Sequence, residues 1–107
     1  MKRLNEIEAR ANAATEGPWE ASMDRVEHAG DSEYAVAYDV AREEDAEFIA
    51  HARTDVPALV AALRAVLELH KHHAGRGGEH CGRCFPDEWG WPCATVAAIR
   101  QHLGEDA

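Results

Sequence analysis

The segment CGRCFPDEWGWPC, from Cys81 to Cys93, brings three cysteines into one short stretch of the chain. Cys81 and Cys84 form a Cys-x2-Cys pair, a spacing that lets two sulfurs reach one metal ion, and Gly82 between them favours a tight turn. Cys93 follows after a loop that contains turn-forming residues and two tryptophans. Because three thiols of one chain cannot all pair as disulfides, the segment predicts a metal site.

A zinc ion in a structural site takes four tetrahedral nitrogen or sulfur ligands, so three cysteines leave one position for a histidine or a carboxylate. His70 ranks first among the seven histidines because it continues the apolar face of the preceding helix and lies at that helix's end. His73 ranks second, at the edge of this face, and His80 third, because it is adjacent to Cys81. His102 lies roughly 13 Å along a helix from Cys93, too far to share the ion. The expected ligands of the structural Zn²⁺ are therefore Cys81, Cys84, Cys93 and His70, with His73 and His80 as alternatives to His70.

Two other interpretations of the cysteine pair stay open, a redox pair and two buried thiols. A thioredoxin-like redox pair opens a helix after a parallel strand, whereas Cys81 follows a glycine-rich loop expected at 74–78. A catalytic zinc keeps one position open for water. Because four protein ligands are expected here, the sequence favours a closed, structural site.

Upstream of the cysteines the apolar residues follow helical and strand periods in turn. Helices are expected over 2–14, 42–53, 55–70 and 92–103, and two antiparallel strands over 19–23 and 34–40, with a break at 30–32. Pro57 is expected in the first turn of its helix, where a missing N–H does no harm. The strongest helical stripe consists of Val56, Leu59, Val60, Leu63, Val66 and Leu67.

These elements predict an α+β fold that is mainly helical, with about four helices, a small antiparallel β-hairpin and a C-terminal structural zinc site. Two strands alone are marginal in water, so the apolar face of the hairpin must lie against a helix. At 107 residues the chain is expected to be a single domain, 1–107. Within it, 1–70 forms the helix–hairpin–helix–helix part and 71–107 the zinc-binding part.

The charge and the absence of targeting signals limit the function classes. With 20 acidic and 11 basic side chains, the formal net charge of -9 opposes a nucleic-acid backbone and suits solubility or a basic partner. The sequence has neither a signal peptide nor an apolar run long enough to span a bilayer. We therefore expect a cytoplasmic protein that binds neither nucleic acid nor membrane.

Three parts of the sequence resemble known proteins. The stretch Leu69-His70, Cys81, Cys84 and Trp91-Pro92-Cys93 with Thr95 is similar to a His…Cys-x2-Cys…Trp-Pro-Cys-x-Thr segment of small accessory proteins from actinobacteria and their phages. Residues 11–19 and 45–57 also resemble phage-encoded accessory proteins. The resemblance implies a phage or prophage origin, a bacterial host cytoplasm and a zinc site with His70 as fourth ligand. It implies no activity. Ala94 stands where the family more commonly has proline, which leaves the ligands unchanged.

Function is expected to rest on binding. No phosphate loop and no nucleophile motif stands in the sequence, so we expect no enzyme. The leading hypothesis is a non-enzymatic accessory protein that binds a protein partner, host-directed or basic. The first alternative is a protein that binds or sequesters a small ligand or nucleotide with its tryptophans and its histidine-rich loop. The second is a zinc ribbon that binds nucleic acid, for which Arg76, Arg83 and Arg100 offer few charges.

Overall fold

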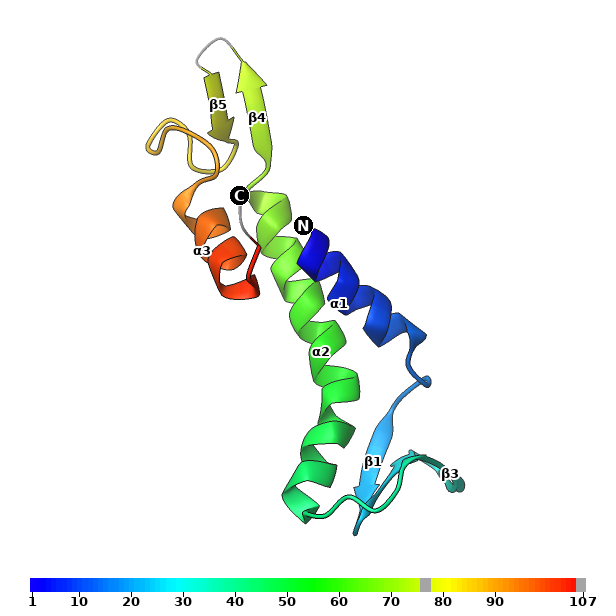
Figure 1. The fold of residues 1–107 in the computed structure, drawn as a ribbon. Helices are drawn as coiled ribbons and strands as arrows, with labels where there is room; N and C mark the ends of the chain where they lie inside the picture. The colour runs from blue at the N-terminus through cyan, green and yellow to red at the C-terminus, as the bar shows by residue number, and fades with distance from the viewer. Residues whose placement is uncertain (76–77, 106–107) are drawn as a thin grey trace. The chain divides into compact units, whose positions relative to one another are not determined.

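The computed structural model (Figure 1) describes residues 1–75 and 78–105 and has an α+β fold. The described part of the chain contains three helices and five short strands, in an antiparallel sheet of three strands and one of two. Two compact units divide the chain: the sheet unit, Ile7–Val60, and the cysteine unit, which combines Met1–Glu6 with Ala61–Ala107. The elements in chain order are α1 (Lys2–Ala13), β1 (Trp19–Ser22), β2 (Arg25–His28), β3 (Asp31–Ala37), α2 (Glu43–Leu69), β4 (His72–Gly75), β5 (Gly78–Cys81) and α3 (Ala94–Leu103).

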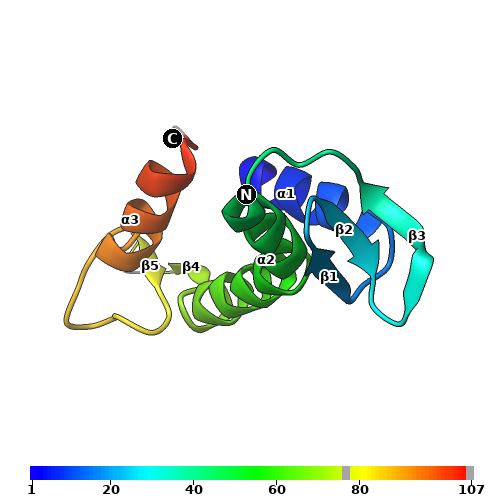
Figure 2. The same ribbon diagram turned by 90° about the horizontal axis from the view of Figure 1, so that it is seen from below.

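The sheet unit holds a three-stranded antiparallel sheet in the order β1-β2-β3, where two strands were expected. The additional strand, β2, has one large hydrocarbon side chain, Val26, so its sequence shows too little alternation to predict it. Val26 is completely buried and packs with Ala46 and Ala50 of α2. Figure 2 shows the three strands on one side of the first half of this helix. The apolar face of the sheet therefore does lie against a helix.

Both turns of this sheet need backbone conformations outside the usual range. Met23 has a φ of 56° between β1 and β2, and Gly30 has a φ of 86° between β2 and β3. Glycine adopts positive φ without steric cost. Of the break predicted at 30–32, only Gly30 lies in the turn, whereas residues 31 and 32 already belong to β3. Strand β3 ends at Ala37, short of the expected residue 40, and Tyr34 and Tyr38 are both exposed.

Helix α2 replaces the two helices that were expected over 42–53 and 55–70, and this corrects the helix count from about four to three within the described residues. Pro57 lies in the interior of α2, where it removes one backbone hydrogen bond at a cost of roughly 3 kcal/mol. Ala50 before it and Val60 after it are both buried. Packing on both sides of the proline thus offsets the lost bond. Leu59, expected in the stripe, is 64% exposed.

In the cysteine unit, strands β4 and β5 form an antiparallel pair where a flexible loop was expected over 74–78. Residues 76–77 of that loop lie outside the described residues. Helix α3 begins at Ala94, two residues later than expected, and ends as expected at Leu103, with Gly104 as its C-cap. The φ of Gly104 is 77°, and its backbone N–H donates to the carbonyls of Arg100 and Gln101. This left-handed glycine is a common helix C-cap.

The first turn of α1 is capped within the same unit. The Glu105 carboxylate accepts hydrogen bonds from the backbone N–H groups of Arg3 and Leu4, the latter at 3.3 Å. A carboxylate suits this position because the first four N–H groups of a helix lack partners and carry partial positive charge. Leu4 is 1% exposed. Among the described residues, no helix combines the length and the apolar character needed to cross a membrane.

Candidate metal centre

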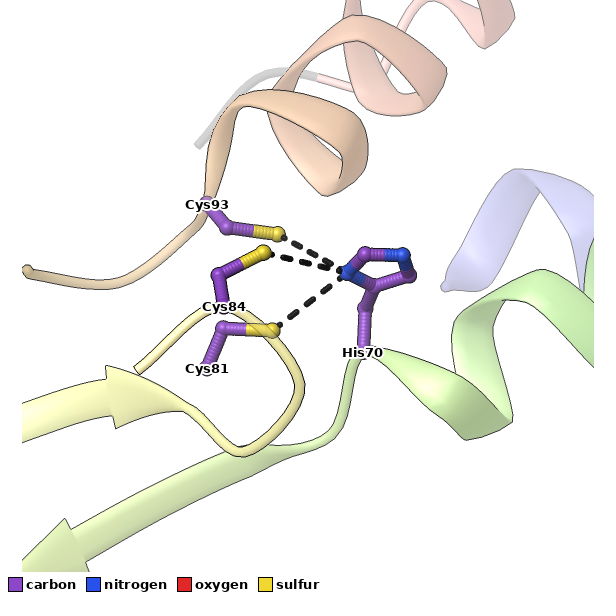
Figure 3. A group of neighbouring side chains, drawn as sticks. All are labelled: His70, Cys81, Cys84 and Cys93. Carbon is purple, nitrogen blue, oxygen red and sulfur yellow. Dashed lines mark hydrogen bonds between the residues drawn. The ribbon is translucent and has the colours of Figure 1, made fainter. Parts of the chain in front are cut away.

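Four side chains from four different local structures converge in the cysteine unit (Figure 3). Cys81 is the last residue of β5 and Cys84 lies in the turn after it. Cys93 is the N-cap of α3. His70 follows directly on the last residue of α2. The four residues that the sequence ranked first therefore lie in one group, and their ligand atoms all lie within 4.8 Å of one another.

The distances around His70 match those of a tetrahedral zinc site. Its Nδ1 atom lies 3.4 Å from the sulfur of Cys81, 3.5 Å from that of Cys84 and 3.6 Å from that of Cys93. Zinc binds sulfur at about 2.3 Å and imidazole nitrogen at about 2.0–2.1 Å, and tetrahedral angles then place nitrogen and sulfur about 3.5–3.6 Å apart. All three distances fall within about 0.2 Å of this value.

Hydrogen bonding alone does not explain this arrangement. One imidazole nitrogen carries either one N–H or one lone pair. It can therefore make one well-aligned hydrogen bond, whereas three sulfurs surround the Nδ1 atom of His70 at nearly equal distance. A cation at the centre of the group is bound by all four atoms at once. The group has the composition and the spacing to hold a metal ion.

The turn after β5 fixes two of the sulfurs. The N–H of Phe85 donates to the carbonyl of Cys81, and the N–H of Glu88 donates to that of Cys84, each at 3.0 Å. The N–H of Gly82 donates to the carbonyl of Lys71 at 2.9 Å, which ties the turn to the start of the hairpin. Backbone hydrogen bonds therefore position the Cys-x2-Cys pair.

Cys93 keeps its sulfur available because another residue caps its helix. As N-cap of α3 it makes no side-chain capping bond. The Glu88 carboxylate instead accepts a hydrogen bond from the N–H of Ala94 at 2.7 Å. This role of Glu88 was not predicted, although an acidic residue shortly before a helix start is a signal for it.

The pKa values of Cys81 and Cys84 are shifted in opposite directions. Burial raises the pKa of Cys81. Hydrogen bonds from the backbone N–H groups of Cys84 and Arg83 and from the side chains of His70 and Cys93 lower it by more, so that the pKa is about 6. Burial and the neighbouring sulfurs of Cys81 and Cys93 raise the pKa of Cys84 to about 12. A bound cation favours the thiolate form of both residues, because it stabilises every thiolate that contacts it.

The site is largely shielded from water. Cys81 is 0% and Cys93 1% exposed, and both pack with Val96. Leu67 and Trp91 lie against this cluster. Of the two tryptophans in the loop before Cys93, Trp91 packs against the cluster, while Trp89 is 62% exposed.

The two alternative ligands, His73 and His80, are outside the group and stack on each other across the β4–β5 hairpin, with ring centroids 5.8 Å apart. His73 also packs over Gly82, where an added Cβ would lie 2.5 Å from its ring. The φ of Gly82 is not positive. The glycine of the Cys-x2-Cys pair thus lies in the turn and also leaves space for a neighbouring ring.

Comparison with known proteins supplies no relative: no protein-family model, no curated protein and no solved structure matches the chain significantly.

Proposed function

We propose that the group formed by His70, Cys81, Cys84 and Cys93 holds one structural Zn²⁺, and that the protein is a non-enzymatic accessory protein acting through a protein partner. The observation that carries the zinc proposal is the set of three nearly equal nitrogen–sulfur distances of 3.4, 3.5 and 3.6 Å. Four protein ligands leave no open coordination position for a substrate or water, which supports a structural role.

The partner proposal is supported by exposed rings on the segment that the metal would hold. The ring centroids of His80 and Phe85 lie 4.4 Å apart, and those of Phe85 and Trp89 4.8 Å apart. Phe85 is 38% and Trp89 62% exposed. Exposed aromatic residues on a rigid turn are typical anchors of protein–protein interfaces. The proposed phage or prophage origin and bacterial host rest on the sequence resemblance, and the proposed cytoplasmic location rests on the lack of a signal peptide and of a membrane-spanning run in the sequence.

The zinc proposal is tested by mass spectrometry of the purified protein under native and denaturing conditions. We expect a native mass that exceeds the denatured mass by one zinc ion. A native protein that carries no metal, with three thiols open to alkylation, contradicts it.

The partner proposal is tested by a pull-down, in which the zinc-loaded protein is immobilised on a resin and incubated with a bacterial lysate at low salt. A true partner is captured by the native protein and lost with Trp89→Ser. The control Phe48→Ser removes a similarly exposed ring, 76% exposed in the sheet unit, and is expected to keep the partner. Equal loss with both variants, or no capture at all, contradicts a docking role for these rings.

A further inference from the structure

A cavity of about 250 Å³ lies within the sheet unit, and none of the metal-centre residues lines it. Hydrocarbon groups form most of its wall: Ile7 and Ala11 from α1, Ala14 directly after it, and Val56 and Pro57 from α2. Small-molecule sites are typically apolar hollows with a few polar groups at fixed positions. The wall of this cavity meets the first of these conditions, since it is mostly apolar.

The polar part of the wall is held in place by one carbonyl. The indole Nε1–H of Trp19 and the Nε–H of Arg53 both donate to the carbonyl of Thr15, at 3.1 and 2.9 Å. The stem of Arg53 also packs against Gly17, where an added Cβ would lie 2.8 Å from its Cγ atom. Trp19 and Arg53 therefore keep their positions without a ligand, which lowers the entropic cost of binding one.

Two arginines, Arg10 and Arg53, are among the residues that line the cavity. In the part of the chain that the structure describes, neither forms an ion pair, although acidic side chains outnumber basic ones by 20 to 11. The Nε–H of Arg53 donates to the carbonyl of Thr15, while its two terminal nitrogens make no hydrogen bond to any of the described residues. Those two nitrogens form the side of a guanidinium that binds a carboxylate with two parallel hydrogen bonds.

We propose that this cavity binds a small carboxylic acid with an apolar body, such as an arylalkyl carboxylate. The body lies among Ile7, Ala11 and Val56, and the carboxylate lies against the terminal nitrogens of Arg53 with Arg10 beside it. An apolar cavity of about 150 Å³ accommodates benzene, so the size here suits one aromatic ring with a short acidic arm. The two cations beside the cavity favour an anionic ligand over a cationic one.

The experiment is a titration of the zinc-loaded, ¹⁵N-labelled protein with 3-phenylpropionate, followed at the indole N–H of Trp19. We expect a saturable shift of this signal. The neutral isostere 3-phenylpropionamide should bind at least about tenfold more weakly, because it cannot form the charge-assisted pair with Arg53. No saturable shift, or equal affinity for acid and amide, overturns the proposal.

Three variants locate the site. Arg53→Gln is expected to weaken binding about tenfold, and Arg10→Gln, an exposed change that leaves the fold intact, is expected to weaken it less. Arg42→Gln is the control, because Arg42 pairs with Glu44 at 2.5 Å in the same unit and lies outside the cavity wall. An equal loss with Arg42→Gln means a general charge effect and overturns the site.

A peptide that ends in phenylalanine carries the same chemistry on a protein terminus, so it forms the second arm of the titration. Affinity about tenfold higher for this peptide than for 3-phenylpropionate would overturn a free acid as the ligand. Zinc content is measured in every sample. Because no metal-centre residue lines the cavity, failure of the acid to bind leaves the zinc result unchanged, and the two proposals fail separately.

Discussion

The two compact units of the chain are stabilised by different chemistry. The buried cluster of the sheet unit consists of hydrocarbon side chains, Val26, Ala46 and Ala50. The buried cluster of the cysteine unit has two thiols and one hydrocarbon side chain, Val96. The hydrophobic effect favours burial of hydrocarbon side chains without any bound ion. The clustered thiols stabilise the fold most when a cation binds them as thiolates. The sheet unit should therefore fold without a metal, and the cysteine unit should depend on one.

The largest expected effect is that of removing the metal. Structural zinc contributes apparent free energies of about 10–16 kcal/mol in zinc-finger peptides at pH 7. On treatment with a strong chelator, backbone amides of 78–103 should lose protection against hydrogen exchange, while those of β1, β2 and β3 keep theirs. Hydrogen exchange with peptide-level resolution measures both. Equal loss in both units, or none, removes the contrast between them.

Loss of a single ligand should act almost as strongly. His70→Ala is expected to weaken zinc binding by more than the roughly 10–100-fold that loss of a second-shell partner costs. His73→Ala is the matched control, because His73 lies outside the ligand group. Zinc affinity from competition with a colorimetric chelator distinguishes the two. A larger loss with His73→Ala would assign the fourth ligand to that residue instead.

A smaller effect is expected in the sheet unit, independent of metal. Val26→Ala should lower the free energy of unfolding by about 1.5–3 kcal/mol, because it removes hydrocarbon from a completely buried position. Zinc content should not change. Phe48→Ala, at an exposed position of α2, is the control and should stay within about 0.5 kcal/mol of the wild type. Denaturant unfolding measures both; loss of zinc in Val26→Ala would contradict the separation.

The smallest effects concern two glycines of the cysteine unit. Gly104→Ala should destabilise the zinc-loaded protein by about 1 kcal/mol, because φ is 77° there and alanine is strained in that conformation. Gly82→Ala should cost less, since the exposed ring of His73 can move away from the added methyl group. Thermal unfolding of zinc-loaded variants orders them. A larger loss at Gly82 would mean that the position of His73 matters to the site.

Much of the metal centre could be predicted because its signals are local. The spacing of Cys81, Cys84 and Cys93 and the helical phase of His70 can be read from neighbouring residues, and the structure brings these four side chains together. The capping role of Glu88 was missed because it depends on how the loop before α3 folds back. Local spacing gives the ligands, and the groups that orient them come from the folded loop.

The fold was predicted less completely, for physical reasons that differ by element. Strand β2 has a single large hydrocarbon residue, and β4 and β5 have histidines and glycines in place of alternation, so their hydrogen-bonded partners define them. Pro57 indicated a helix start, but packing on both sides carries α2 through it. In each case tertiary contacts outweigh a local preference.

The division of the chain also sets an order of events during synthesis. The sheet unit is one continuous stretch, Ile7–Val60, while the cysteine unit needs Met1–Glu6 together with Ala61–Ala107. Because the ribosome makes the chain from its N-terminus, the sheet unit can fold while the zinc ligands are still being added. His70 emerges first and Cys93 last, so the four-ligand site cannot close before Cys93 has left the ribosome. On the zinc proposal, metal uptake is therefore a late step in the synthesis of this protein, and a shortage of zinc would leave a folded sheet unit attached to an incompletely folded cysteine unit.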